Sequence, residues 1–211
     1  MSVSSWVADR VPTDLLHLDS AAAGRLSVAT LEAELAHLRR EQERGAYVAE
    51  TEADLAPGRA ALGALVGLAA QDVFFAEGSA QAFATLLDAW PLERGARVGT
   101  TPGEFGGLAR LLARRAEQCG WELVTLPVDE LGRVSDVPGG LDLLSLPQVA
   151  SHRGVVQPVA EVLASGVPVV LDVAQSAGQT PVPPGAAAYV GSSRKWLCGP
   201  RGVGFGVVAP A

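Results

Sequence analysis

The sequence predicts an α/β fold in which a mainly parallel, mixed sheet is flanked by helices. From about residue 72 onwards, short apolar segments alternate with amphipathic ones, which is the pattern of β-α-β units. The segment VPVVLDVA at 167–174 is continuously apolar, as expected of a strand buried on both faces. Hydrophobic residues make up 48% of the 211 residues, which is enough for a sizeable core.

The expected elements follow one another in a regular order. An irregular lead-in at 1–24 precedes two helices, at 31–44 and 53–69. Strands at 72–78, 96–101, 121–128 and 141–147 then combine with helices at 79–90 and 107–120. A short helix at 158–165, the buried strand at 167–174 and strands at 186–192 and 202–209 complete the order. We divide the chain into an N-terminal segment, 1–30, and one large domain, 31–211.

Charge and composition exclude several classes of function. The net charge of −7 does not favour nucleic acid, whose phosphates need a cationic face. Charged or glycine residues interrupt every apolar stretch that approaches membrane-spanning length, and the N-terminus has no secretory pattern, so we expect a cytoplasmic protein. Cys119 and Cys198 show neither metal-ligand spacing nor a disulfide framework, and a structural role is expected for both.

One basic residue stands out by its type. The chain has 16 basic residues, and Lys195 is the only lysine among them. Arginine cannot replace lysine where a neutral amine must attack a carbonyl, because the guanidinium stays protonated. A GC-rich genome and chance survival explain the same composition, so this fact alone does not decide the role of Lys195.

Three segments that follow strands carry candidate chemistry, since ligands bind at the carboxyl ends of parallel strands. The turn at Ser79 and Ala80 opens a helix and offers free N–H groups to a phosphate, although Ser79 also suits an ordinary helix cap. Asp172 ends the buried strand, where it pairs with a ring N–H or caps a helix. Lys195 lies between a strand and a Gly-Pro-Arg-Gly turn, among mixed neighbours unlike a polar linker.

The order of GSAQA, DVAQSAG and SSRKWLCGPRGVG resembles the class V aminotransferases, a group of fold-type I enzymes that use pyridoxal 5′-phosphate. The LDSAAAG and GVVQPV segments extend the resemblance over nearly the whole chain. The pair D-x-x-Q and S-x-(H/R)-K-x-x-x-GP(R/K)G is specific, and the other motifs are supportive. The resemblance implies the three-layer large domain of a fold-type I enzyme without its smaller C-terminal domain. Further structure is expected beyond the final strand.

The resemblance also implies a role for individual residues. Lys195 would form the Schiff base and later move protons, Asp172 would pair with the pyridine nitrogen, and Gln175 would contact the phenolic oxygen. The remaining expected cofactor contacts are Ser79 and Ala80 through the backbone, Ser192 and Arg194 through side chains, the stacking ring of Phe105, and Ser151 near the phenolic oxygen, with His152 as its alternative.

Two departures from the family pattern bear on the reaction. Cysteine desulfurases carry His where this chain has Phe105, and His where it has Arg194. The R-K-W-L-x-GPRG stretch most closely resembles the ergothioneine C–S lyases. The resemblance therefore implies C–S cleavage of a cysteine S-conjugate by a homodimer, with a small sulfur-containing amino acid as substrate.

Other outcomes stay open at the level of sequence. Desulfuration, selenocysteine cleavage, transamination and epimerisation share the same early chemistry, and the branch depends on substrate contacts outside these motifs. A truncated or degenerate relative that binds the cofactor without turnover is the non-enzymatic alternative. The joint presence of Lys195, Asp172 and Gln175 favours an active parent.

Overall fold

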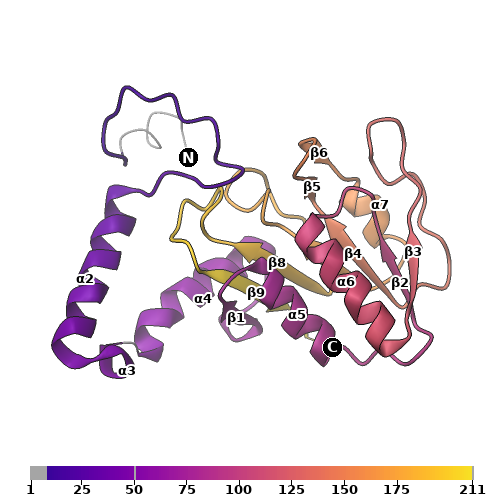
Figure 1. Ribbon diagram of the computed structural model, residues 1–211, viewed down its shortest axis with the longest axis horizontal. Coiled ribbons are helices and arrows are strands. Elements are labelled where there is room, and N and C mark those ends of the chain that lie inside the picture. Colours follow the sequence, from indigo (N-terminus) through magenta and orange to yellow (C-terminus); the bar gives the residue numbers. More distant parts are fainter. Residues whose placement is uncertain (1–8, 50, 211) are drawn as a thin grey trace.

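A computed structural model describes residues 9–49 and 51–210, so residues 1–8 of the expected N-terminal segment, residue 50 and residue 211 lie outside the described residues. Three helices come first: α2 at Val28–Arg44, α3 at Ala46–Ala49 and α4 at Glu52–Val66. Figure 1 shows α2 standing to one side of the sheet, and none of its residues is buried.

The main sheet has seven strands in the order β1-β9-β8-β7-β4-β2-β3. Their bounds are β1 Val73–Ala76, β2 Arg97–Thr100, β3 Glu122–Thr125, β4 Leu143–Pro147, β7 Val169–Asp172, β8 Ala188–Ser192 and β9 Gly204–Val208. The five strands from β8 to β3 are parallel, whereas β9 is antiparallel to both of its neighbours. A separate hairpin pairs β5 (Val149–Ala150) with β6 (Val155–Val156).

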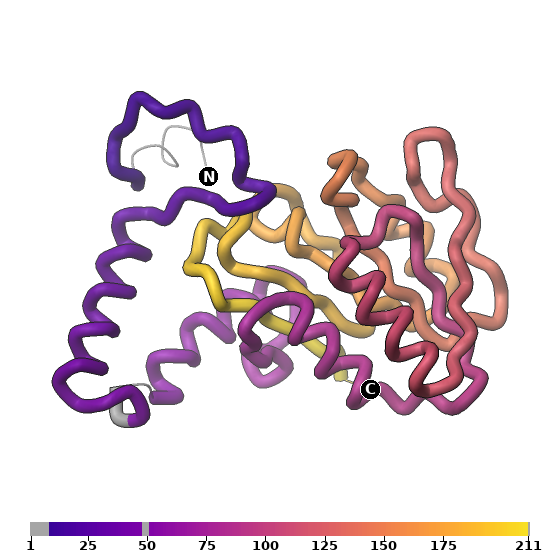
Figure 2. The backbone as a smooth tube through the Cα atoms, viewed as in Figure 1, coloured from indigo at the N-terminus to yellow at the C-terminus, as the bar shows by residue number. Residues whose placement is uncertain are grey.

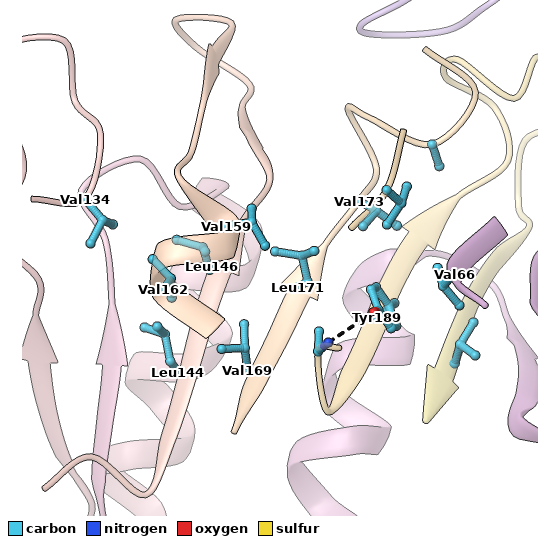
Figure 3. Packing of buried hydrophobic residues seen from close by; sticks show 14 of the residues in the cluster. Val66, Val134, Leu144, Leu146, Val159, Val162, Val169, Leu171, Val173 and Tyr189 are labelled. Atoms are coloured by element: carbon cyan, nitrogen blue, oxygen red, sulfur yellow. Dashed lines mark hydrogen bonds between the residues drawn. The ribbon is translucent and has the colours of Figure 1, made fainter. Parts of the chain in front are cut away.

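Helices cover both faces of this sheet and give three layers. One face carries α5 (Ser79–Ala89) and α6 (Gly106–Cys119), and the other carries α7 (Val159–Leu163) and the end of α4. Alternate strand residues enter the two cores because side chains alternate along a strand. In β7, Val169 and Leu171 pack on the α7 face (Figure 3), while Val170 packs on the α5 and α6 face.

The expected α/β fold with a mixed, mainly parallel sheet is confirmed, and each strand range expected from the sequence contains a strand. The expected helix at 53–69 is wrong at its end, because Gly67 adopts a left-handed conformation and stops α4 at Val66. The sequence also missed α3, the 3-10 turn η1 at Ala70–Asp72 and the β5–β6 hairpin. Among the helices of the described part, none is long and apolar enough to cross a membrane.

Candidate active site

The side chains of three strand residues meet at the carboxyl edge of the sheet. Asp172 and Ser192 each end a strand, and Ser145 lies two residues before the end of β4. All three share the strand parity of Leu143, Val170 and Val190, which pack in the core beneath α5 and α6. Their side chains therefore face the side where the N-termini of α5 and α6 lie.

Lys195 follows β8 and reaches into this region. Its side chain is buried, and its Nζ lies 5.5 Å from the centre of the Phe105 ring, where a cation and an aromatic face attract each other. Burial lowers the pKa of Lys195 below its ordinary value and nearby Arg194 lowers it further, while Asp172 acts in the opposite direction. A lysine in such surroundings has a larger neutral fraction, which is the nucleophilic and proton-accepting form.

Asp172 is a carboxyl group held in a nearly dry place. It is 8% exposed, and it accepts a hydrogen bond of 2.8 Å from the backbone N–H of Ala174. Burial raises its pKa, and the Ala174 bond and the charge of Lys195 partly oppose that rise. A cationic N–H beside Asp172 would satisfy this carboxylate, because a buried charge is stabilised by an opposite charge that also donates.

The N-terminus of α5 lies beside Ser192 through the strand register. Across neighbouring strands, Ser192 is paired with Gly204, and Gly204 is paired with Ala76. A Cβ on Gly204 would stand 2.3 Å from the carbonyl carbon of Gly78, so only glycine lets the start of β9 approach this turn. The free N–H groups at the start of α5, around Ser79, thus lie close to the buried Ser192 hydroxyl.

The N-terminal segment 21–24 crosses the Lys195 loop, as the indigo and yellow parts of Figure 2 show. The backbone N–H of Gly24 donates to the Arg194 carbonyl at 2.7 Å, and the Arg194 guanidinium donates to the Ala22 carbonyl. The Gln175 carboxamide bonds Ala21 and Trp196. Two of the expected cofactor contacts, Arg194 and Gln175, are therefore brought to the site and tied to this segment.

Glu104 is a buried site carboxyl that the sequence reasoning missed. Its Oε2 accepts a 2.7 Å bond from the Ser145 hydroxyl, and its Oε1 accepts a 2.8 Å bond from the Phe105 N–H. Burial, reinforced by the charge of Asp172, raises the pKa of Glu104 to about 7. These bonds attach the loop carrying Phe105 to β4, and the only sequence signal was an acidic residue beside the proposed stacking ring.

Some expected residues lie farther out. Ser151 and His152 are exposed on the turn that joins β5 and β6, so their expected contact with the phenolic oxygen stays a prediction. Phe105 is 42% exposed, which leaves ring surface open to a ligand.

Cys119 and Cys198 are both free thiols. Buried Cys198 lies against Gly24, where an added Cβ would be 2.6 Å from its sulfur.

The donor set fits the cofactor that the resemblance implied. The Lys195 amine, whose pKa is lowered, suits an aldehyde. The buried Asp172 carboxylate suits a pyridine N–H. An exposed aromatic ring suits stacking, and a helix N-terminus beside a serine suits a phosphate. The start of α5 offers backbone N–H groups and the buried Asp172 offers a carboxylate, and such a molecule carries a phosphate and a ring N–H that match them.

Comparison with known proteins identifies the class that this fold and site define. The sequence profile of the family described as "Aminotransferase class-V" matches residues 16–210, and the chain belongs to that family.

One curated relative, the probable hercynylcysteine sulfoxide lyase of Mycobacterium tuberculosis (strain CDC 1551 / Oshkosh), is 42% identical over 221 residues. That match covers 97% of this chain and 54% of the relative, so the chain spans about half the length of the curated relative that it matches.

Solved structures share the same fold. The apo cysteine desulfurase from Thermococcus onnurineus NA1 superposes with a TM-score of 0.85 at 21% identity, covering 99% of this chain and 57% of that chain. The cystine C–S lyase C-DES, in complex with its reaction product cysteine persulfide, gives a TM-score of 0.79 at 23% identity. The match covers 90% of this chain and 56% of that chain. At these identities the likeness shows the fold alone.

Proposed function

We propose that this chain is the cofactor-binding large domain of a pyridoxal 5′-phosphate-dependent lyase that cleaves the C–S bond of a cysteine S-conjugate. The observation that carries the proposal is the position of Lys195, the only lysine of the chain. Its amine lies over the Phe105 ring at the carboxyl edge of the sheet, and the charge of Asp172 acts on its pKa.

Each neighbouring residue would hold one part of the cofactor. Lys195 would attach it through the amine, and Asp172 would accept a hydrogen bond from its ring nitrogen. The N–H groups of Ser79 and Ala80, with the Ser192 hydroxyl, would hold the phosphate. Arg194, Gln175 and Ser151 are proposed as further cofactor contacts, and Phe105 as the stacking ring.

When bound, pyridoxal phosphate supplies an electron sink for the charge left when a substrate Cα loses its proton. The chain supplies the base for that step. Because burial lowers the pKa of Lys195, its Nζ is poised to take up the Cα proton once the substrate has displaced it. The buried Asp172 carboxylate stabilises positive charge on the N–H that it accepts.

The substrate class rests on the mycobacterial relative, which is named a probable hercynylcysteine sulfoxide lyase. Identity of 42% along 97% of this chain supports a shared substrate class, an S-substituted cysteine sulfoxide. The resemblance places Phe105 where cysteine desulfurases usually carry His, so a possible acid–base group is replaced here by a ring that cannot titrate. The replacement of His by Phe105 therefore favours elimination of the sulfur substituent over desulfuration.

Spectroscopy of the purified chain with added pyridoxal phosphate tests the proposal. We expect a visible absorbance band that borohydride reduction converts into a stable adduct on the Lys195 peptide. Since the chain has one lysine, the N-terminal amine is the only other amine able to form such an adduct. Lys195→Ala should lose the adduct, and a cysteine sulfoxide conjugate should yield pyruvate from the wild type. An adduct confined to the N-terminus would refute the proposal.

We further propose a homodimer in the cytoplasm. Leu15, Leu16 and Leu18 are each about four-fifths exposed, and Leu38 of α2 is exposed as well. Several exposed leucines in the N-terminal part of one chain favour a partner that covers them. Light scattering across a concentration series should give twice the 21.7 kDa chain mass, and a constant monomer mass contradicts the dimer. Free Cys119 and Cys198 suit a reducing compartment, which cell fractionation checks.

A further inference from the structure

The Gln175 carboxamide is held from two sides by partners far from it in the sequence. Gln175 follows β7 by three residues, and its side chain is buried. Its Nε2 donates a 3.0 Å hydrogen bond to the carbonyl of Ala21. Its Oε1 accepts a 2.8 Å hydrogen bond from the indole Nε1 of Trp196, the residue directly after Lys195.

The chemistry of these two partners fixes which way the amide points. An indole N–H donates and cannot accept, so the atom facing Trp196 must be the Gln175 oxygen. A backbone carbonyl accepts and cannot donate, so the atom facing Ala21 must be the Gln175 nitrogen. Rotating the amide by half a turn would set donor against donor at Trp196 and acceptor against acceptor at Ala21. Both partners therefore select the same orientation.

The position of Trp196 is itself fixed by close packing of the main chain. Gly178, at the end of the turn that carries Gln175, has φ +89 and would place a Cβ 2.6 Å from the Trp196 carbonyl oxygen. The thiol of Cys198 donates to that same oxygen at 3.6 Å. Because the Gln175 turn and the Trp196 backbone are in direct contact, the main chain that carries the indole cannot move away from the amide without moving the Lys195 loop.

We propose that Trp196 is a positioning residue that makes Gln175 a hydrogen-bond donor toward the bound cofactor. An amide nitrogen has two hydrogens, and Ala21 takes one of them. The second is left to donate to an oxygen of the cofactor ring, whereas the Gln175 oxygen is turned away toward Trp196. This inference rests on the proposed function, since it concerns the cofactor that Gln175 would meet.

Loss of the donor has a spectroscopic consequence that loss of packing does not share. A hydrogen bond donated to an acidic oxygen favours its deprotonated form and lowers the pH at which it titrates. In Trp196→Phe only the Ala21 carbonyl still selects the orientation of the amide. The amide is then less firmly held as a donor toward the cofactor, so the midpoint of the pH titration of the visible absorbance band should rise. We expect a rise of about 0.5–1 pH unit, the size of one neutral hydrogen bond.

The test titrates the band in the cofactor-loaded wild type, Trp196→Phe, Gln175→Leu and the double variant. Gln175→Leu should raise the midpoint at least as far, and Trp196→Phe should add nothing in that background, because Trp196 acts through Gln175. Trp121→Phe is the matched control, since the buried Trp121 indole N–H has no hydrogen-bond partner among the described residues. Its midpoint should equal that of the wild type. Trp196→Leu replaces the Phe variant if melting shows the latter unfolded.

The outcomes separate this inference from the proposed function. A band that titrates in the wild type and has the same midpoint in Trp196→Phe overturns the role of Trp196 alone. Equal shifts by Trp196→Phe with and without Gln175 overturn it as well, because the indole would then act by another route. A wild type that forms no visible band with pyridoxal phosphate overturns both proposals.

Discussion

Replacing Glu104 by Gln should change how the stability of this protein depends on pH. Glutamine has the same shape, and its Oε1 can still accept from the Phe105 N–H while its Nε2 donates to the Ser145 hydroxyl. The bond from Phe105 is therefore kept, the contact with Ser145 is kept with its direction reversed, and the variant cannot ionise.

The direction in which stability changes with pH follows from the pKa of Glu104, which burial raises from 4.5 to about 7 in the folded protein. Between these values the unfolded chain releases the proton while the folded protein retains it, so stability falls as pH rises through this window. Below it both states are protonated, and above it both are ionised, so the contribution is constant on either side.

The size of the change in unfolding free energy depends on how much of the pH range between the two pKa values can be measured. Because the sequence pI is about 5.0, urea unfolding followed by circular dichroism is best carried out from pH 5.5 to 8. At ~1.36 kcal/mol per pH unit, ionisation of Glu104 removes about 2 kcal/mol from the unfolding free energy across that range. Glu104→Gln should therefore gain about 2 kcal/mol relative to the wild type between pH 5.5 and pH 8.

A matched control removes one negative charge elsewhere. Glu130 is exposed on the turn before Gly132, and Glu130→Gln should give a curve parallel to that of the wild type. A difference in unfolding free energy between Glu104→Gln and the wild type that stays constant from pH 5.5 to 8 would contradict the raised pKa of Glu104.

Three further substitutions test the packing around the site by chemical denaturation. Gly204→Ala should cost about 1–3 kcal/mol because its Cβ would meet Gly78, whereas Gly139→Ala, with open space around it, should be nearly neutral; equal effects would contradict this close approach. Tyr189→Phe leaves the Ala186 N–H without its 3.1 Å partner and should cost about 1–3 kcal/mol, so an unchanged midpoint argues against that bond. Leu171→Ala removes most of a fully buried side chain from the core on the α7 side of the sheet and should lower the unfolding free energy by about 2–5 kcal/mol. A loss below 1 kcal/mol would place Leu171 outside the core.

Local patterns in the sequence predicted the strands and most of the helices, because burial on one face or two leaves a period in the chain. The Val-rich run before Asp172 gave a buried strand, and Gly120 ended α6 as expected. The β5–β6 hairpin was missed because two-residue strands are too short to show a period. The end of α4 was misjudged because apolar residues continue past Gly67 into the next turn.

The sequence by itself determined which residue types were available for chemistry, above all the single lysine at 195 and the motifs around Asp172 and Ser79. Only the tertiary structure decided what those residues touch. Glu104 became a site residue because the parity of β4 aims Ser145 at it. Gln175 meets Ala21, 154 residues away, and Arg194 meets Ala22, 172 residues away. Such contacts leave no period in the chain, since they depend on how distant segments cross one edge of a sheet.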